Sequence, residues 1–427
     1  MITNKKDYFL EMKWRGMLHD SMPGSLELMA KESITGYWGA DPTSDSLHVG
    51  NLASMMLLIH SQRFGHKPIL LVGGATGLVG DPSGKKSERP LMRLEELNHN
   101  LTSIKAQASR FLDFESKHNG ALVVNNYEWF KDFNLFDFLR QVGKHITVNY
   151  MLAKDSVKNR MEDGLSYTEF TYQLIQGYDF YHLWKHYGCK LQYGGSDQWG
   201  NMTTGTELIR RMAGGEAYVI TCPLITKADG TKFGKSEGGN VWLDPAKTSP
   251  YKFYQFWLNA ADAEVERYLK VFTFLSQEEI TDTMTKLIAD PSARAAQKKL
   301  AAELTALVHG RSELEKAMVA TNLLFKGGIE DLKKLSTAEM KEIFEGIPVH
   351  TCQKGMWDTE ISLLDFLTTI TGMYGSKGEA RKMIQQGGLK LNREKLTLES
   401  GVDQSHFING SFLLLEQGKD KKYLVIA

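Results

Sequence analysis

Short apolar runs mark the first half of the chain. Residues 68–72 and 122–124 are continuously apolar, which is typical of strands buried on both faces of a parallel sheet. Residues 34–38 and 190–193 are further short runs of β-type residues, and the second of these ends at a glycine pair. The pattern therefore predicts buried strands at these positions.

Helical periodicity fills the segments between these runs. Residues 52–59, 103–112 and 165–187 follow a helical pattern, and the last of these segments is rich in aromatic residues. Strand, helix and strand at this spacing indicate βαβ units. We therefore predict an α/β fold with a parallel sheet.

The composition of the chain changes near residue 245. Glycine becomes rarer, and residues 291–308 and 313–325 are predicted to form consecutive helices. Gly346 and Pro348 interrupt this helical stretch, and two further helices and several short strands are predicted near the C-terminus. These changes divide the chain into segments 1–245, 246–345, 346–358, which is a short linker, and 359–427.

Composition places the chain among ordinary globular proteins. It has 427 residues, of which 42% are hydrophobic, and its 51 Lys and Arg balance its 51 Asp and Glu. The apolar runs are too short to span a bilayer, and residues 1–7 lack the apolar core of a secretory signal. We therefore expect a protein of the cytoplasm that has no membrane partner. Cys189, Cys222 and Cys352 are scattered, which argues against a disulfide framework or a zinc cluster.

Candidate chemistry begins at residues 41–51, in the turn between the first of these strands and the next helix. The free N–H groups at a helix N-terminus favour phosphate. His48 can donate a hydrogen bond to a phosphate oxygen, and Gly50 would let a flat ring approach the backbone. The alternative is a helix cap by Asp45 or Ser46 with an incidental histidine, and the motif alone favours this alternative.

Glycines crowd residues 73–85, which follow the next strand. Their spacing does not fit G-x-G-x-x-G, and Lys86 stands where a P-loop has Ser or Thr. The segment therefore indicates either an anion or nucleotide near a βα turn, or only a tight turn.

Two polar clusters follow. Tyr172, Gln176 and Asp179 share one face of a helix, which is either the wall of a pocket or a solvent face. Residues 194–201 begin with a glycine pair at the end of a strand, and Asp197 could bind a pair of ribose hydroxyls or cap a helix.

A glycine-rich loop carries two lysines in the sequence Lys232-Phe233-Gly234-Lys235-Ser236. Such a loop can close over a polyphosphate. By itself, the pattern is more typical of an exposed basic loop.

In their order and joint presence, these motifs resemble those of the class I aminoacyl-tRNA synthetases. Residues 48–51, His-Val-Gly-Asn, are similar to the His-Ile-Gly-His element of that family, and residues 232–236 to its Lys-Met-Ser-Lys-Ser element. Gly-Asp-Pro-Ser-Gly-Lys at 80–85, Tyr-Gln-x-x-Gln-Gly-Tyr-Asp at 172–179 and Gly-Ser-Asp-Gln-Trp-Gly-Asn at 195–201 resemble signatures of the bacterial tyrosine-specific members. The resemblance extends over nearly the whole chain.

The resemblance implies a role for each matching residue. The tyrosine substrate would be bound by six residues: Tyr37, Asp81, Tyr172, Gln176, Asp179 and Gln198. Among them, Tyr37 and Asp179 would contact the phenol. The ATP side would be lined by Asp41, Thr43, His48, Gly50, Asn51, Gly195, Asp197 and Lys235. The catalytic set would be His48, Asn51, Lys85, Arg89, Lys232, Lys235 and Ser236. Asn51 replaces the second His of one motif, and Gly234 replaces the central Ser of the other.

The resemblance also implies the reaction and its partners. The carboxylate of L-tyrosine attacks the α-phosphate of ATP and expels pyrophosphate, and the tyrosyl group then passes to the 3′ end of tRNA(Tyr). ATP would arrive with Mg²⁺, and no tightly bound protein metal is expected. Residues 1–245 would form a Rossmann-like catalytic domain, residues 246–345 an α-helical anticodon-stem domain, and residues 359–427 a small α+β αL RNA-binding domain. A homodimer is also implied.

The C-terminal segment carries a local excess of positive charge. Residues 376–395 hold six Lys or Arg against two Glu. A solvated helix face is the usual reason for such a run. The segment also resembles the αL RNA-binding module, and that resemblance implies RNA contacts for Lys377, Arg381, Lys382 and Lys390.

Two alternatives remain open at this point. One is a tryptophan-specific synthetase of the same subgroup, although Tyr37 and Asp179 favour a phenol and that subgroup lacks the αL tail. The other is a catalytically inactive, synthetase-derived RNA-binding protein, although His48, Asp197, Lys232 and Lys235 are all retained.

Overall fold

The computed structural model describes residues 7–83, 93–161, 164–226, 233–236, 239–325, 327–335, 339–340, 344, 349–351, 360–418 and 421–426. The chain forms two compact units. Unit 1 comprises Met1–Lys247 and Leu258–Val308, and unit 2 comprises Thr248–Trp257 and His309–Ala427.

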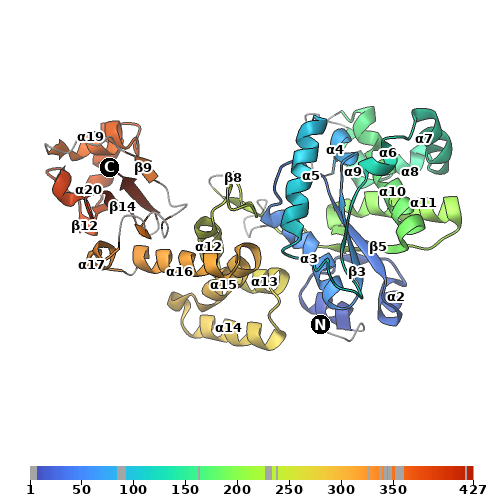
Figure 1. Cartoon of the computed structure of the whole chain (residues 1–427), viewed down its shortest axis with the longest axis horizontal. Coiled ribbons are helices and arrows are strands. Elements are labelled where there is room, and N and C mark those ends of the chain that lie inside the picture. Colours follow the sequence, from blue (N-terminus) through green and yellow to red (C-terminus); the bar gives the residue numbers. More distant parts are fainter. Residues whose placement is uncertain are drawn as a thin grey trace. The chain divides into compact units, whose positions relative to one another are not determined.

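A six-stranded sheet forms the centre of unit 1 (Figure 1). Its strands are β1 (Asp20–Ser21), β2 (Thr35–Ala40), β3 (Lys67–Val72), β4 (Leu122–Asn125), β5 (Cys189–Gly195) and β6 (Tyr218–Cys222). They lie in the order β1-β6-β5-β2-β3-β4. The pairs within β2–β6 are parallel and β1 is antiparallel to β6. The parallel sheet predicted from the apolar runs is therefore confirmed.

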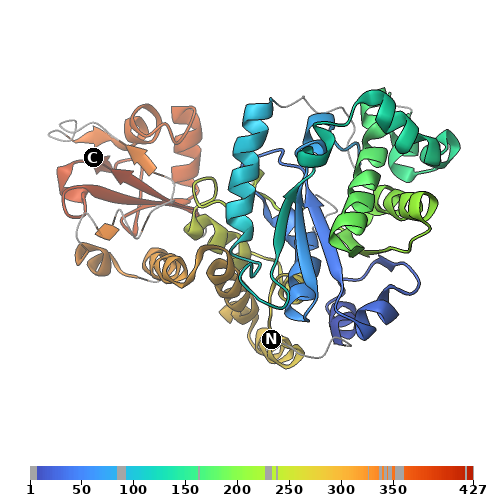
Figure 2. The ribbon, with the colours of Figure 1, turned by 45° about the vertical axis from the view of Figure 1, so that its right-hand side comes forward.

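Helices cover both faces of this sheet (Figure 2). Helix α3 (Val49–Arg63) packs on β2, β3 and β5, while α10 (Tyr167–Tyr187) and α11 (Trp199–Ala213) pack on β5 and on each other. Two adjacent residues of β2 show the alternation. The ring of Tyr37 contacts Phe180 of α10, and the indole N–H of Trp38 donates to Ser54 of α3.

Further helices complete the first part of unit 1. They are α1 (Asp7–Trp14), α2 (Ser25–Lys31), α4 (Thr76–Val79), α5 (Leu94–Ala108), α6 (Tyr127–Phe130), α7 (Leu135–Gln141), α8 (Val148–Leu152) and α9 (Asp155–Met161). Helix α5 begins earlier and ends earlier than the predicted segment 103–112. Its apolar positions continue into a turn at residues 109–112, where Phe111 and Leu112 are buried, so periodicity alone misplaced its end.

Unit 1 also includes α13 (Asp262–Phe272), α14 (Gln277–Ala289) and α15 (Ala295–His309), of which the last residue belongs to unit 2. The buried guanidinium of Arg15, just after α1, ties this segment to the N-terminus. It donates to the backbone carbonyls of Lys270, Thr273 and Leu275 at 2.7–2.9 Å. Carbonyls at and beyond the end of α13 are thereby satisfied by a charged donor.

Unit 2 is built on α12 (Pro250–Leu258, whose last residue belongs to unit 1), α16 (Arg311–Phe325), α17 (Ile329–Lys333) and a five-stranded sheet. The sheet order is β12 (Glu394–Lys395), β11 (Leu389–Leu391), β14 (Phe412–Gln417), β15 (Lys421–Ile426) and β9 (Val349–Thr351). A separate ladder pairs β10 (Ile361–Ser362) with β13 (Gly401–Val402). Further helical elements described in unit 2 are α19 (Leu363–Asp365), a π-helical turn (Phe366–Ile370), α20 (Lys377–Gln385) and a 3₁₀ turn (Gln404–His406).

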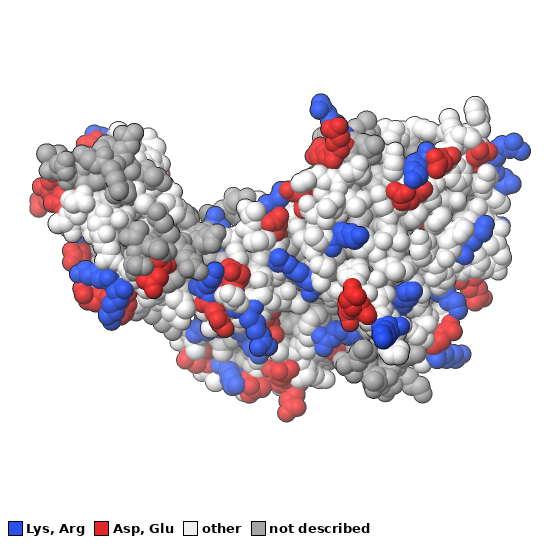
Figure 3. Space-filling model, viewed as in Figure 1, with Lys and Arg blue, Asp and Glu red and all other residues white. Residues whose placement is uncertain are grey.

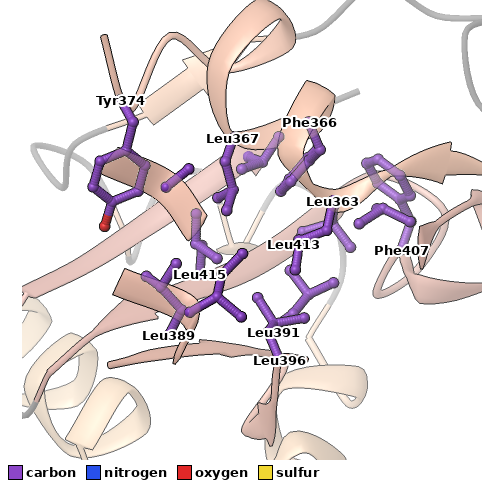
Figure 4. Close-up of a cluster of buried hydrophobic side chains, with 14 residues drawn as sticks. Leu363, Phe366, Leu367, Tyr374, Leu389, Leu391, Leu396, Phe407, Leu413 and Leu415 are labelled. Atoms are coloured by element: carbon purple, nitrogen blue, oxygen red, sulfur yellow. The ribbon is translucent and has the colours of Figure 1, made fainter. Parts of the chain in front are cut away.

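Both faces of the unit 2 sheet are buried. Leu413 and Leu415 of β14 point into a cluster with Leu363 and Phe366 (Figure 4). Phe412 and Leu414 point the other way, into a cluster with α16 and α17. The apolar run at 412–415 is therefore explained by a strand covered on both sides.

No helix in the described ranges combines the length and the apolar character that a membrane span requires.

Candidate active site

Three candidate segments follow the carboxyl ends of neighbouring parallel strands. Residues 41–51 follow β2, residues 73–83 follow β3, and residues 196–201 follow β5. Strand β2 lies between β3 and β5 in the sheet, so the chain order reverses there. Open α/β sheets bind ligands at such a switch point.

Asp41 joins two of these segments to α10. Its carboxylate accepts hydrogen bonds from Thr76 Oγ1 at 2.6 Å and from the hydroxyl of Tyr172 at 2.9 Å. Gly73 makes this approach possible, because a Cβ there would stand 2.2 Å from both Asp41 Oδ1 and Thr76 Oγ1. The glycine after β3 is therefore required by packing at the site.

A second carboxylate, Asp81, lies in the same network. It accepts from Gln198 Nε2 at 2.7 Å and from the backbone N–H of Ser83 at 2.9 Å. Burial raises the pKa of Tyr172 well above its usual value, and the negative charges of Asp41 and Asp81 raise it further. The structure thus brings together Asp41, Asp81, Tyr172 and Gln198. Two carboxylates around a buried hydroxyl make a region suited to an ammonium group.

Asp179 is buried on α10, about two helical turns after Tyr172. Its two oxygens accept hydrogen bonds from Asn126 Nδ2 at 3.0 Å and from Trp129 Nε1 at 2.9 Å. Burial raises the pKa of this carboxyl to about 8, although both hydrogen bonds act in the opposite direction. The indole of Trp129 is itself held by stacking on His182, with ring centroids 4.3 Å apart.

Two of the predicted tyrosine-binding residues carry buried polar atoms without a partner among the described residues. The hydroxyl of Tyr37 and Oε1 of Gln176 are buried and have no hydrogen-bond partner among the described residues. Burial raises the pKa of Tyr37 well above its usual value, and the negative charge of Asp179 raises it further. Buried polar groups in native proteins are almost always paired. Such atoms therefore indicate a place for the polar end of a ligand.

His48 is the N-cap of α3. Its Nδ1 accepts from the backbone N–H groups of Gly50 at 3.1 Å and Asn51 at 3.3 Å, while Asn51 Oδ1 accepts from the N–H of His48. The alternative of a cap by Asp45 or Ser46 with an incidental histidine was therefore wrong, because His48 itself caps α3. Because Nδ1 accepts, the neutral ring carries its proton on Nε2, which can donate to a phosphate.

The glycine-rich loop lies against this helix start. Gly234 has a φ of 83°, and a Cβ there would stand 2.8 Å from Val49 Cγ2. The N–H of Val49 donates to Val241 O, and the N–H of Val241 donates to Gly234 O. These contacts explain why glycine occupies the position of the central Ser. The loop continues into the hairpin of β7 (Lys235–Ser236) and β8 (Gly239–Asn240).

The other predicted residues fall into two groups. Thr43, after β2, and Asp197, after β5, are exposed. Gly50 lies close to the ring of His48, and Gly195 lies close to the carboxylate of Asp197. Lys85, Arg89 and Lys232 lie outside the described residues, and only the backbones of Lys235 and Ser236 are described.

Several residues at the site were not predicted. Asn126 and Trp129 hold Asp179, and Thr76 holds Asp41. Gln107 of α5 accepts from Leu47 N at 3.0 Å and from Ser46 Oγ, and so fixes the turn that carries His48. A polar residue on the inner face of a helix was the available signal for Gln107.

Comparison with known proteins identifies the family of this chain. A family model described as class I tRNA synthetases (W and Y) matches residues 29–326. A second, described as the tyrosine–tRNA ligase SYY-like C-terminal domain, matches residues 339–426. A tyrosine–tRNA ligase of Bacteroides fragilis is 54% identical over 424 residues, covering 98% of this chain and 99% of the relative. The chain belongs to the tyrosine–tRNA ligase family.

Other members of the family agree. A tyrosine–tRNA ligase of Flavobacterium johnsoniae is 53% identical over 428 residues, covering 99% of each chain. The crystal structure of a C-terminally truncated mitochondrial tyrosyl-tRNA synthetase of Aspergillus nidulans superposes with a TM-score of 0.67 at 32% identity. It covers 74% of this chain and 94% of its own. The resemblance seen in the sequence is thus confirmed, and the class I synthetase fold with it.

No group of three or more His, Cys, Asp and Glu side chains suited to a metal ion occurs within the described ranges of this synthetase.

The substitution Asp179→Asn tests the protonation state of this carboxyl. The group ionises near its ordinary pKa of 3.8 when unfolded, but near 8 in the native protein. Between these values the native state binds more protons, so raising the pH favours unfolding. We expect the free energy of unfolding of the unmodified protein to fall, relative to the variant, by about 1 kcal/mol per pH unit between about pH 5 and 7. Urea unfolding at constant ionic strength measures this difference. A difference independent of pH would show that Asp179 is ionised in the native state.

Proposed function

We propose that this chain activates L-tyrosine with ATP, forming tyrosyl-adenylate and pyrophosphate, and then transfers tyrosine to the 3′ end of tRNA(Tyr). The observation that carries the proposal is the burial of the Asp179 carboxyl near the hydroxyl of Tyr37, which has no hydrogen-bond partner among the described residues. A phenol between them satisfies both groups. The family membership of the whole chain supports the same reaction.

Specificity for tyrosine follows from that burial. The phenol forms one hydrogen bond with the Asp179 carboxyl, and its oxygen accepts a second from the hydroxyl of Tyr37. Phenylalanine offers neither bond, so it leaves two buried polar groups unpaired and binds at the cost of their desolvation. Asn126 and Trp129 keep the carboxylate oxygens oriented for this contact. Gln176, Tyr172 and Asp81 hold the ammonium group, and Gln198 lies at the carboxylate end.

Activation needs positioning and charge stabilisation rather than a protein nucleophile. The tyrosine carboxylate is itself the nucleophile and requires no general base. His48 donates from Nε2 to a phosphate at the start of α3, where Asn51 and Gly50 shape the turn. Asp197 binds ribose, with Asp41, Thr43 and Gly195 around the nucleotide. Lys85, Arg89, Lys232, Lys235 and Ser236 surround the pyrophosphate. ATP enters as its Mg²⁺ complex.

The functional division of the chain follows the three-part scheme. Residues 1–245 carry activation, residues 246–345 contact the anticodon stem, and residues 359–427 bind folded RNA after the linker at 346–358. Lys377, Arg381 and Lys382 are exposed on α20, and Lys390 is exposed on β11. In the view of Figure 3, Lys and Arg are interspersed with Asp and Glu, so RNA contact depends on this local cluster rather than on net charge. The enzyme acts in the cytoplasm, where its macromolecular partner is tRNA(Tyr).

The protein acts as a homodimer. Large apolar side chains are exposed on α7, around α8 and at the start of α10: Leu135, Phe136, Leu139, Val148 and Tyr167. Phe136 and Tyr167 are 75% and 71% exposed. An exposed apolar face of this kind marks an interface, and a second copy of the chain is its occupant.

The variant Asp179→Ala tests whether Asp179 binds the phenol of the substrate. Tyrosine-dependent exchange of pyrophosphate into ATP should fall to background, because the only buried carboxylate facing the phenol within the described site is lost. The unfolding transition should remain cooperative. Asp282→Ala, at an exposed position of α14, serves as the control and should retain exchange. Tyrosine activation retained in the folded Asp179→Ala protein would contradict the assignment.

The same exchange assay, run on the unmodified protein with each standard amino acid and no tRNA, separates the alternatives. Dependence on tyrosine alone is expected. Exchange with tryptophan would favour the tryptophan-specific alternative, and no exchange with any amino acid would favour the inactive RNA-binding protein.

Removing the basic cluster tests the RNA-binding role. The combined substitution of Lys377, Arg381, Lys382 and Lys390 by Ala should lower tRNA charging about tenfold or more and make its salt dependence shallower, with tyrosine activation unchanged. Lys190→Ala, at the amino end of β5, is the control. Deleting residues 357–427 should likewise weaken charging and spare activation. That deletion also uncovers the apolar residues of α16 and α17, so the cluster variant is the cleaner test. Unchanged charging by the cluster variant would refute the role.

Phe136→Asp tests the dimer. A charge placed in this exposed apolar face should shift the mass, measured by light scattering at micromolar concentration, from dimer to monomer. Ile288→Asp is the matched control, because Ile288 is 77% exposed on α14, away from this face. A dimeric Phe136→Asp protein would place the interface elsewhere, and a monomeric unmodified protein would refute the dimer.

A further inference from the structure

The turn between β11 and β12 contains a residue that does not suit its backbone. Leu391 pairs with Glu394, so Asn392 and Arg393 form a two-residue hairpin loop. Their φ angles are 48° and 76°. Turns with positive φ at both positions favour Asn first and Gly second. Arg393 therefore occupies a strained position where glycine is the usual residue.

The side chain of Arg393 explains why the strain is tolerated. Its Nη2 donates to the carbonyl oxygens of Leu323 at 2.9 Å, Leu324 at 2.7 Å and Gly327 at 3.1 Å. The first two carbonyls belong to the last turn of α16, which carries the negative end of the helix dipole. The guanidinium thus caps α16 from a different part of the chain.

The same guanidinium also reaches the sheet. Its Nη1 donates to Glu416 Oε1 of β14 at 2.7 Å, and Glu416 is buried at 4% exposure. Lys422 of β15 pairs with the same carboxylate, and its ammonium lies 5.3 Å above the ring of Phe325 at the end of α16. Two cations and one buried carboxylate therefore link α16, β14, β15 and the hairpin turn.

Apolar packing surrounds this charged link. Leu324 of α16 and Leu332 of α17 lie in one buried cluster with Phe412, Leu414 and Leu424 of the sheet. Met340 and Phe344, from the segment that follows α17, lie in the same cluster. The sheet and α16 share a core within unit 2.

We propose that Arg393 is a positioning residue that locks the C-terminal sheet onto α16. The lock fixes the basic side chains of α20 and β11 relative to α16, so that both contact one folded RNA as a single rigid surface. This inference rests on the proposed RNA-binding role of residues 359–427. It also gives Arg393 a structural use, distinct from that of the exposed cations around it.

The variant Arg393→Gly tests the lock without damaging the turn, because glycine adopts a φ of 76° freely. Loss of the charged hydrogen bonds should raise the KM for tRNA about tenfold. The kcat of charging and tyrosine-dependent pyrophosphate exchange should stay unchanged. Amide hydrogen exchange, measured on peptides from α16 and β14, should become faster. An unchanged KM for tRNA, slowed exchange of pyrophosphate, or unchanged amide exchange would each overturn the proposal.

A second variant separates the lock from direct RNA contact. Glu416→Gln weakens the link but leaves every positive charge in place, so it should also raise the KM for tRNA. If Arg393→Gly raises the KM and Glu416→Gln does not, Arg393 contacts RNA itself and the lock is refuted. The basic-cluster variant is measured beside both. If the basic-cluster variant weakens tRNA charging and the Arg393→Gly variant does not, only the lock is refuted. If the basic-cluster variant leaves tRNA charging unchanged, the RNA-binding role itself is refuted.

Discussion

The burial of one carboxyl group, that of Asp179, sets the conditions for the whole substrate pocket. A buried carboxylate is unfavourable unless it is paired, and here two N–H donors from the segment after β4 partly offset the loss of water. Those donors must themselves be fixed. Asn126 Oδ1 accepts from the backbone of Ala75, and Trp129 stacks on His182. The phenol site thus depends on the sheet, on α10 and on the segment after β3 at once.

The nucleotide side uses the start of α3 in a complementary way. At the phenol, polar groups are buried, and the hydroxyl of Tyr37 has no hydrogen-bond partner among the described residues until a substrate arrives. At His48, a side chain closes the helix end, which fixes the ring and leaves Nε2 as the donor. Gln107 holds the preceding turn from α5. Recognition of the amino acid and of the phosphates therefore rests on two kinds of preorganisation, one by burial and one by capping.

Much of this arrangement could be predicted from local sequence. Strands β3 and β4 are short apolar runs, β2 and β5 are short runs of β-type residues that end near glycines, and α10 has a clear helical pattern. Asn126, Trp129 and Gln107 could not be found in the same way, because each acts on a residue about 50 or more positions away. The same holds for Arg393, whose sequence context indicates only a basic surface. Its contacts with α16 arise from packing of segments about 70 residues apart.

Unit 2 is discontinuous in the sequence, and this has a consequence for protein synthesis. Tyr251 of α12 is buried in the same cluster as Phe412 and Leu424, which leave the ribosome about 160 residues later. At the usual rate of translation, that delay is roughly ten to thirty seconds. During this time the apolar surface of α12, and later that of α16, has no native cover. Nascent chains of this protein therefore present a binding site for chaperones, and the last strands to be made remove it.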